Sequence, residues 1–352
     1  MENLTLRIGG KAFAGWEVVQ VQRTMEALCG SFRLEVSAPG PIGSFPINQG
    51  ARCEIFIGPD LYLSGYVDRL SSRYSKRDHG FTVEGRDLAQ DLVDGSPSGL
   101  DWEYYNVGLL ELGVLLAQPF GVEVKLQAGV GDVPVFGRFA INPGETAHDA
   151  LERACRLREF LLVSDALGTV WITRAGTRRA TAGITADGPV EAVRWASDWS
   201  GRFHHYIVMG QTPGSDLKYG ADCASMQGDD FDLTVRSQRT MVINAEGNVD
   251  DDLAQRRATW EANVRAARSR QLEVVVSGWR ERHDRGPLWE PNVIVPVNLP
   301  AVNAFGDWLV RDVSFSLTPN ENVATLSLVP PDAYLPEPPD PELEPDFEGE
   351  EE

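Results

Sequence analysis

The chain has 352 residues, which is long enough for two or three domains with well-buried cores. Its formal net charge of −20 argues against a nucleic-acid-binding protein, because such proteins use basic surfaces to displace counterions. No apolar run reaches the ~18 residues that a membrane span needs, and the first residues lack the pattern of a secretory signal.

The N-terminal third, residues 1–95, has the pattern of short alternating strands. Apolar side chains occupy every second position in residues 32–36, 53–57 and 81–83, and segments rich in Gly, Pro and Asp separate these runs. This spacing is typical of a small antiparallel barrel or sandwich. We therefore predict a first β-barrel domain in this third of the chain.

The middle, residues 96–190, has the pattern of a small α/β module. Thr146 and Asp149 have the spacing of a helix capping box, and they precede an apolar stripe of helical period. The predicted elements are a helix within 106–121, a second helix within 144–160, and two strands around a turn within 161–174.

The last folded third, residues 191–334, returns to strand patterns and is predicted to form a second β-barrel domain. One long helix interrupts it at about 250–268, with an apolar side formed by Leu253, Trp260, Val264 and Ala267. The predicted strands lie at 204–210, 231–237, 271–278, 292–297, 308–317 and 323–329.

A weak internal repeat links the outer thirds of the chain. Residues 65–85 and 308–328 each contain a Val, two opposite charges, an aliphatic residue and a Ser, followed by a polar turn and another alternating strand. The repeat fits two related barrels that flank an inserted α/β module. The predicted fold class is therefore α+β and mainly β.

The C-terminal segment, residues 335–352, is predicted to be disordered. From Pro336 onward it carries nine acidic residues, five prolines and no Lys or Arg. Like charges and prolines prevent a packed core.

The segment 83–96 is the first candidate site, because it gathers Arg86, Asp87, Asp91 and Asp94. On a helix the three aspartates would share one face and could hold Mg²⁺ or Ca²⁺. No fourth ligand or calcium-loop spacing is present, so a short helix with a solvated acidic face is favoured. Arg86 is expected to make a charge-assisted bond that fixes the domain junction.

Other chemistry is not indicated by the residue patterns. Glu145, His148 and Glu152 resemble half of a metal site on a helix, but a polar outer face is favoured over a metal site. Nucleophile-elbow, phosphate-loop and dinucleotide motifs are absent, so no catalytic residue, cofactor or metal is predicted. The four cysteines, none spaced as C-x-x-C, are expected to be buried, reduced thiols of a chain that folds in cytoplasm.

Nine tryptophans form the last candidate set. Trp16, Trp279, Trp289 and Trp308 stand beside Gly or Pro turns or at strand ends. Stacking on a sugar is one interpretation, but core and subunit-contact roles are favoured, since Trp is enriched in both. Trp279, Trp289 and Trp308 are therefore structural or interface candidates, together with Arg86, Asp87 and Asp91.

Several segments, taken in order, resemble the baseplate hub proteins of contractile-tailed phages, of the phage Mu type. The resemblance extends to about residue 333, and the order of the segments is more specific than any one of them. The segments are 14–36, 63–74, 81–96, 139–176, 272–280, 289–298 and 308–317.

This resemblance implies a structural protein of the virion tail, assembled in the cytoplasm of a bacterial host. Each subunit of a homotrimer would supply two tail-tube-like barrels, giving a ring of pseudo-sixfold symmetry. The ring would join the sixfold tail tube, or a tube-initiator protein, to the threefold central spike, with baseplate wedge proteins around it. DNA would pass through the lumen without specific binding, along a wall expected to be acidic.

Two alternatives remain at this point. A hub or spike component of a type VI secretion or tailocin machine would share the architecture. A tail-associated cell-wall hydrolase would need paired acid and nucleophile residues, and none stands out in the sequence.

Overall fold

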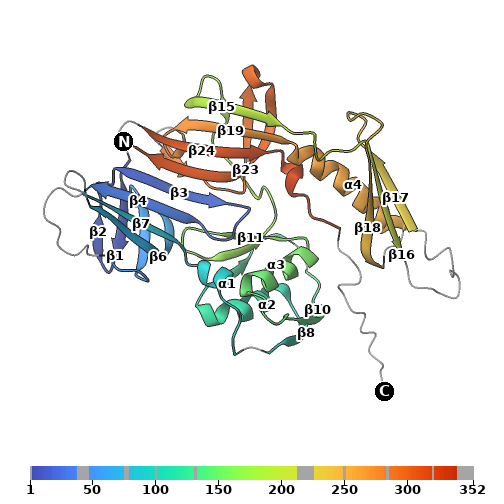
Figure 1. Cartoon of the computed structure of the whole chain (residues 1–352), viewed down its shortest axis with the longest axis horizontal. Helices are drawn as coiled ribbons and strands as arrows, with labels where there is room; N and C mark the ends of the chain where they lie inside the picture. The colour runs from blue at the N-terminus through green and yellow to red at the C-terminus, as the bar shows by residue number, and fades with distance from the viewer. Residues whose placement is uncertain are drawn as a thin grey trace.

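The computed structural model describes residues 2–37, 47–74, 79–99, 101–130, 133–211, 226–248, 251–282, 285–318 and 321–338. The chain is mainly β, with one large sheet, a small α/β module against it, and a three-stranded sheet with a long helix to one side (Figure 1). The predicted α+β, mainly β class is confirmed. Within these residues, no helix is both long and apolar enough to cross a membrane.

The large sheet contains two units with the same arrangement of five antiparallel strands. The chain visits the five spatial positions in the same order in both units. In spatial order the first unit is β3 (Val18–Thr24), β4 (Ser31–Ser37), β7 (His79–Asp87), β6 (Asp60–Tyr74) and β5 (Arg52–Ile57). The second unit is β15 (Val190–Ser197), β19 (Arg270–Ser277), β24 (Asn322–Val329), β23 (Ala304–Leu317) and β22 (Val293–Leu299).

The internal repeat in the sequence is a repeat of structure. Hairpins β6–β7 and β23–β24 each contain one register shift, and the extra residue is Asp68 in β6 and Arg311 in β23. These two residues are equivalent in the sequence repeat. A β-bulge increases the local twist of a strand, so the two hairpins are bent at the same point.

The two units join because β23 also pairs with β3. Phe315 lies opposite Val21 at the centre of this antiparallel contact, and both side chains are fully buried. One hydrophobic core runs behind both units, and Tyr62 of the first contacts Phe315 of the second with ring centroids 4.6 Å apart. The described strands form an open path from β15 to β2, so closure of either unit into a barrel stays a prediction.

Shorter strands extend both units. Strands β1 and β2 continue the sheet beyond β5, and β13 and β14 pair in parallel with β22. Their bounds are β1 (Leu4–Ile8), β2 (Lys11–Phe13), β13 (Arg178–Arg179) and β14 (Ile184–Thr185); the remaining small elements are β20 (Arg280–Arg282), β21 (Arg285–Leu288), η3 (Pro300–Val302) and η4 (Pro331–Tyr334).

The α/β module packs around a hydrophobic core of its own. The capping box at Thr146 and Asp149 is confirmed, since each side chain accepts the other residue's backbone N–H. The elements are α1 (Gln90–Asp94), β8 (Glu103–Val107), α2 (Leu109–Ala117), η1 (Gln118–Phe120), β9 (Val124–Leu126), β10 (Phe136–Ala140), α3 (Ala147–Leu157), β11 (Leu161–Ser164) and β12 (Val170–Thr173).

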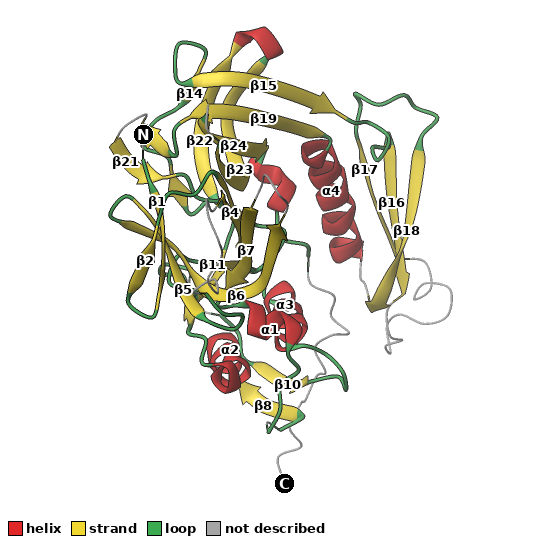
Figure 2. Ribbon diagram, turned by 60° about the vertical axis from the view of Figure 1, so that its left-hand side comes forward, coloured by secondary structure: helices red, strands yellow, loops and turns green. Residues whose placement is uncertain are grey.

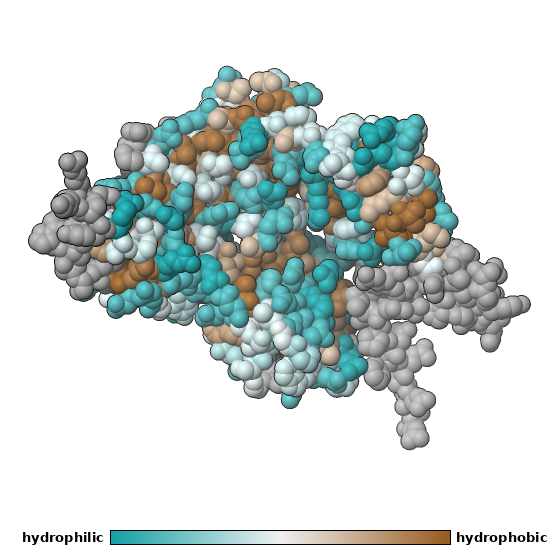
Figure 3. Space-filling model, in the orientation of Figure 1, coloured by the Kyte–Doolittle hydropathy of each residue, from teal (hydrophilic) through white to brown (hydrophobic). Residues whose placement is uncertain are grey.

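A separate lobe is inserted between β15 and β19 (Figure 2). Helix α4 (Asp251–Arg268) matches the long helix predicted at about 250–268. It covers one face of the sheet formed by β16 (His205–Gln211), β17 (Met226–Phe231) and β18 (Thr240–Asn248). The other face exposes Met209, Phe231 and Val242, and Figure 3 shows an apolar patch over this lobe.

The predicted strand at 231–237 is wrong beyond Phe231. Asp232 accepts hydrogen bonds from the backbone N–H and the hydroxyl of Thr234 and forms an ion pair with Arg202 (2.5 Å). Such local side-chain bonds hold a turn, which overrides the apolar alternation of Leu233 and Val235.

The disordered C-terminal segment was predicted to begin too early. The indole N–H of Trp260 on α4 donates to the carbonyl of Leu335 (2.8 Å), and Arg257 pairs with Glu337. These contacts hold residues 335–338 against the helix, while residues 339–352 lie outside the described part of the chain.

We therefore expect truncation after Pro338 and truncation after Tyr334 to differ in their effect on stability. A chain that ends at Pro338 should keep its midpoint of thermal unfolding. A chain that ends at Tyr334 should lose about 1–2 kcal/mol of unfolding free energy, because one hydrogen bond and one ion pair are removed. Urea unfolding of both chains measures the difference, and equal stabilities would contradict it.

Candidate functional site

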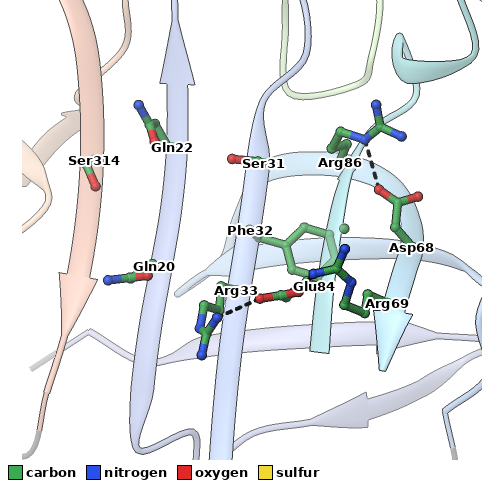
Figure 4. A pocket seen from close by; sticks show the side chains of 11 residues that line it. Gln20, Gln22, Ser31, Phe32, Arg33, Asp68, Arg69, Glu84, Arg86 and Ser314 are labelled. Carbon is green, nitrogen blue, oxygen red and sulfur yellow. Dashed lines mark hydrogen bonds and ion pairs between the residues drawn. The ribbon is translucent and has the colours of Figure 1, made fainter. Parts of the chain in front are cut away.

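The large sheet has one polar face, and this face is hollowed over the first unit, as far as the neighbouring strand β23 of the second. Strand alternation places Gln20, Gln22, Arg33, Glu84 and Ser314 on this face, whereas their neighbours in sequence point into the core (Figure 4). The hollow is open, has a volume of about 470 Å³ and extends across strands β23, β3, β4, β7 and β6. Amides, hydroxyls and paired charges form its surface.

The arginines of this hollow are matched by carboxylates. Arg33 contacts Glu84 (2.7 Å) and Glu35 (2.6 Å). Arg69 lies 3.5 Å from Glu84, which is thereby shared between two arginines. Because these guanidinium groups already have anionic partners, the face can hold water but offers little uncompensated positive charge to a polyanion.

Arg86 closes the hollow at the bulge of β6. Its guanidinium binds Asp68 (2.9 Å) and both carboxylate oxygens of Asp94 (3.0 and 2.6 Å). Hydrogen bonding to Arg86 lowers the pKa of the Asp94 carboxyl. The expected charge-assisted bond of Arg86 is thus present and joins β7 to the end of α1, although the groups are partly exposed.

Asp87 lies behind this face and connects the sheet to the module. Its carboxylate is only 1% exposed and accepts hydrogen bonds from Gly30 N–H (2.6 Å), Ala89 N–H (2.9 Å) and the hydroxyl of Ser164 (2.7 Å). Burial raises the pKa of Asp87, while these donors oppose the rise. One side chain therefore holds together the start of β4, the entry to α1 and the end of β11.

The acidic face predicted for residues 83–96 does not form. Helix α1 begins at Gln90, so Asp87 belongs to the end of β7 rather than to the helix. Asp91 is exposed, Asp94 is bound to Arg86, and Asp87 points into the junction. The three carboxylates do not converge on a cation, and the solvated face preferred over a metal site was itself wrong for Asp87.

The second candidate set is also divided. Glu145 turns away to form an ion pair with Arg153 (2.9 Å) and to accept the N–H of Asn142 (2.9 Å). His148 and Glu152 instead approach Asp149, which takes part in the helix cap. Glu145 is therefore not grouped with His148 and Glu152, and the polar outer face that the sequence favours over a metal site stays a prediction.

The three candidate tryptophans lie in the core. Trp279, Trp289 and Trp308 are 0%, 2% and 5% exposed, so the core role, one of the two favoured from sequence, describes them. Trp102, Trp195 and Trp199 are about half exposed and were not singled out. Trp195 lies in an edge strand, and no local sequence signal marks that position, because strand order is set by the fold. Cys53 and Cys155 are buried free thiols and Cys29 is half-buried, while Cys223 lies outside the described residues.

Comparison with known proteins gives matches along most of the chain. Residues 3–87 match the Mu phage baseplate assembly protein GpP-like N-terminal domain, residues 89–174 the second domain of baseplate hub protein gp44-like proteins, and residues 251–337 the fourth domain of Mu phage baseplate assembly protein GpP. The crystal structure of the 43 kDa tail protein of prophage MuSo2 from Shewanella oneidensis is 30% identical, with a TM-score of 0.84. It covers 96% of this chain and 100% of that one.

The chain belongs to the Mu-type baseplate hub family. Baseplate hub protein gp44 of Escherichia phage Mu is 29% identical over 94% of this chain and 89% of its own length. The tail protein of Neisseria meningitidis MC58 shares the fold, with a TM-score of 0.78 at 21% identity over 96% and 99% of the two chains. Members of this family are structural tail proteins, and the hub chain is not an enzyme.

Replacement of Asp87 tests the junction. Asp87→Asn should cost about 2–3 kcal/mol of unfolding free energy. The NH2 of the new amide would face at least one buried donor whose hydrogen bond the carboxylate accepts in the parent protein. Asp91→Asn is the matched control on the exposed side of α1 and should stay within about 0.5 kcal/mol of the parent. Denaturant unfolding measures both, and equal effects would show that Asp87 does not hold the junction.

Arg86 should matter less than Asp87. Arg86→Ala removes ion pairs that are partly exposed, so the expected loss is about 1 kcal/mol or less. The effect should shrink further at 1 M salt, where screening weakens the pairs in the parent protein. A loss larger than that of Asp87→Asn would reverse the proposed order of importance.

Proposed function

We propose that this protein is the structural hub of a contractile phage baseplate, and that three copies form a ring between the tail tube and the central spike. Two observations support the proposal. The Mu-type tail protein of known structure matches over its full length. The chain also contains two equivalent five-stranded units, so three copies would present six units to a sixfold tube.

In this proposal the partners differ on the two sides of the ring. The repeated units, assigned to residues 1–95 and 191–334, would form tail-tube-like barrels and face the tail tube or a tube-initiator protein. The threefold arrangement of whole subunits would receive the central spike. The α/β module, assigned to residues 96–190, would face the baseplate wedge proteins.

The polar sheet face is proposed to line the channel through which DNA leaves the tail. Its arginines are paired with carboxylates, and its centre carries amides and hydroxyls. The wall would therefore be nearly neutral. This differs from the acidic wall that the net charge of the chain suggests. Paired cations release few counterions on contact with DNA, so the genome would slide without specific binding.

The proposed location is the virion baseplate, after assembly in the host cytoplasm. The match to a phage tail protein over that protein's whole length favours a phage tail over a type VI secretion machine. The matched charges of the sheet face provide no acid and nucleophile pair for a cell-wall hydrolase.

We expect the isolated hub to be a trimer, or to become one when the spike protein is added. Interfaces that persist bury large, partly apolar areas, and this chain exposes apolar side chains along β15 and on its inserted lobe. Light scattering at micromolar concentrations should give three times the mass of the chain. A monomer both alone and with the spike would contradict the proposed ring.

A further inference from the structure

The geometry points to a defined subunit contact: strand β15 of one copy pairs antiparallel with β6 of a second copy. This inference rests on the proposed ring and names the strands that would close it. Strand β15 ends the large sheet and has a strand, β19, on one side only within the described residues (Figure 1). An exposed edge of this kind is a template for another strand.

The pairing of β23 with β3 inside the chain shows the geometry that the contact between copies would repeat. Strand β23 is long, and its other neighbour, β22, covers it only from Ala304 to Val310. Its remaining part, from Asp312 to Leu317, pairs with β3 of the other unit. The fourth strand of one unit thus receives the first strand of the next unit.

Strand β6, the equivalent of β23, has the same layout. Strand β5 pairs with it only as far as Tyr66, so no described strand covers the same edge over residues 69–72. Strand β15, the equivalent of β3, has no such partner among the strands that the structure describes. Among the described strands, the two edges that would form a second junction of this kind, β15 and residues 69–72 of β6, are therefore both unpaired.

The ladders fix which residues correspond. Val21 lies opposite Phe32, and Phe32 opposite Gly85. In the second unit Trp195 lies opposite Leu272, and Leu272 opposite Leu328. Gly85 and Leu328 are equivalent, since each pairs with the residue just before the extra residue of its hairpin. Gly85 pairs with Val67, and Leu328 pairs with Val310.

This correspondence aligns Val21 with Trp195, and Phe315 with Ser72. Because Phe315 faces Val21 inside the chain, Trp195 should face Ser72 of the second copy. The sizes are exchanged: a large and a small side chain meet in both junctions, but on opposite strands. Trp195, now 47% exposed, would then be covered, as Val21 already is at 0%.

Charged side chains at one end of the proposed β15–β6 pairing also fit this register. Inside the chain, the hydroxyl of Thr24 donates to Asp312. The corresponding pair between copies is Asp198 with Arg69, an aspartate against an arginine whose side chain is 76% exposed. The register also sets Arg194 against Arg73, and Glu273, opposite Arg194 on β19, supplies compensating negative charge.

The contact joins different surfaces of the two copies, so it can propagate from subunit to subunit. Such a head-to-tail contact closes into a ring when the rotation between copies divides a full turn. The alternation of inner and outer junctions would then make one continuous sheet around the channel.

Disulfide trapping tests the register directly. Ser71→Cys with Ala196→Cys places two thiols opposite each other, where facing Cα atoms lie about 4.5–5.5 Å apart, within disulfide range. The control, Ser71→Cys with Ala192→Cys, uses another exposed alanine on the same face, about 13 Å away along the strand. A Cys223→Ser background and the single-cysteine variants control for other thiols.

The expected result is oxidised dimer and trimer with the first pair and neither with the control pair, on non-reducing gels of protein that is trimeric by light scattering. A trimer that yields no such product, or equal products from both pairs, would overturn the β15–β6 contact and leave the ring proposal standing. A protein that stays monomeric with the spike would overturn both.

A second measurement uses the two half-exposed tryptophans. Trp195→Ala should raise the concentration at which the trimer dissociates by roughly tenfold or more, since it removes an aromatic side chain from the contact. Trp199→Ala, equally exposed at 47% but beyond the end of β15, should change it less than about threefold. Equal effects of the two substitutions would contradict the assignment of Trp195 to the contact.

Discussion

The antiparallel pairing of β23 with β3 is the constraint on which the rest of the molecule depends. It joins two five-stranded units into one sheet and brings Tyr62 and Phe315 into a common core. Strands in one ladder must keep a common spacing and twist, so the pairing fixes the orientation of one unit relative to the other. The hollow on the polar face lies mainly on the first unit, and this orientation brings Ser314 of the second unit to its edge.

The α/β module is fixed to this sheet by buried polar bonds at Ser164. The Ser164 hydroxyl donates to Asp87, and its carbonyl accepts from the guanidinium of Arg23 (2.5 Å). Asp87 ends β7 and Arg23 lies near the end of β3, so two strands of the first unit hold the same module residue. Buried polar groups are costly when unpaired, so this arrangement favours one position of the module over alternatives.

Local patterns predicted the elements well where local forces decide them. The capping box at Thr146, the long helix α4 and most strands follow from periodicity and capping, which depend on neighbours in sequence. The turn at Asp232 was missed because a side-chain bond outweighs apolar alternation there. Asp87 was placed on a helix because its partners Gly30 and Ser164 are distant in sequence and leave no local signal.

The joining of the two units could not be read from either repeat. A repeated hairpin indicates that two units are alike, but the contact between β23 and β3 involves residues almost three hundred positions apart. The tryptophans illustrate the same limit. Trp279 and Trp195 both occupy strand-rich sequence near turns, and only the fold shows that the first is enclosed and the second remains at an edge.

The two junctions of the repeat face different physical demands, and their residues differ accordingly. The inner junction forms once, during folding, and can bury Val21 and Phe315 completely. A strand that awaits a partner must stay soluble, and an open edge is protected by charges and bulges. Strand β15 has both: Arg194 is exposed, Asp198 follows directly, and the register shifts at Glu191. The same charges that discourage unspecific pairing can favour one partner, because Asp198 is complementary to Arg69 and not to an arbitrary strand. The edge can therefore combine solubility before assembly with selectivity during it.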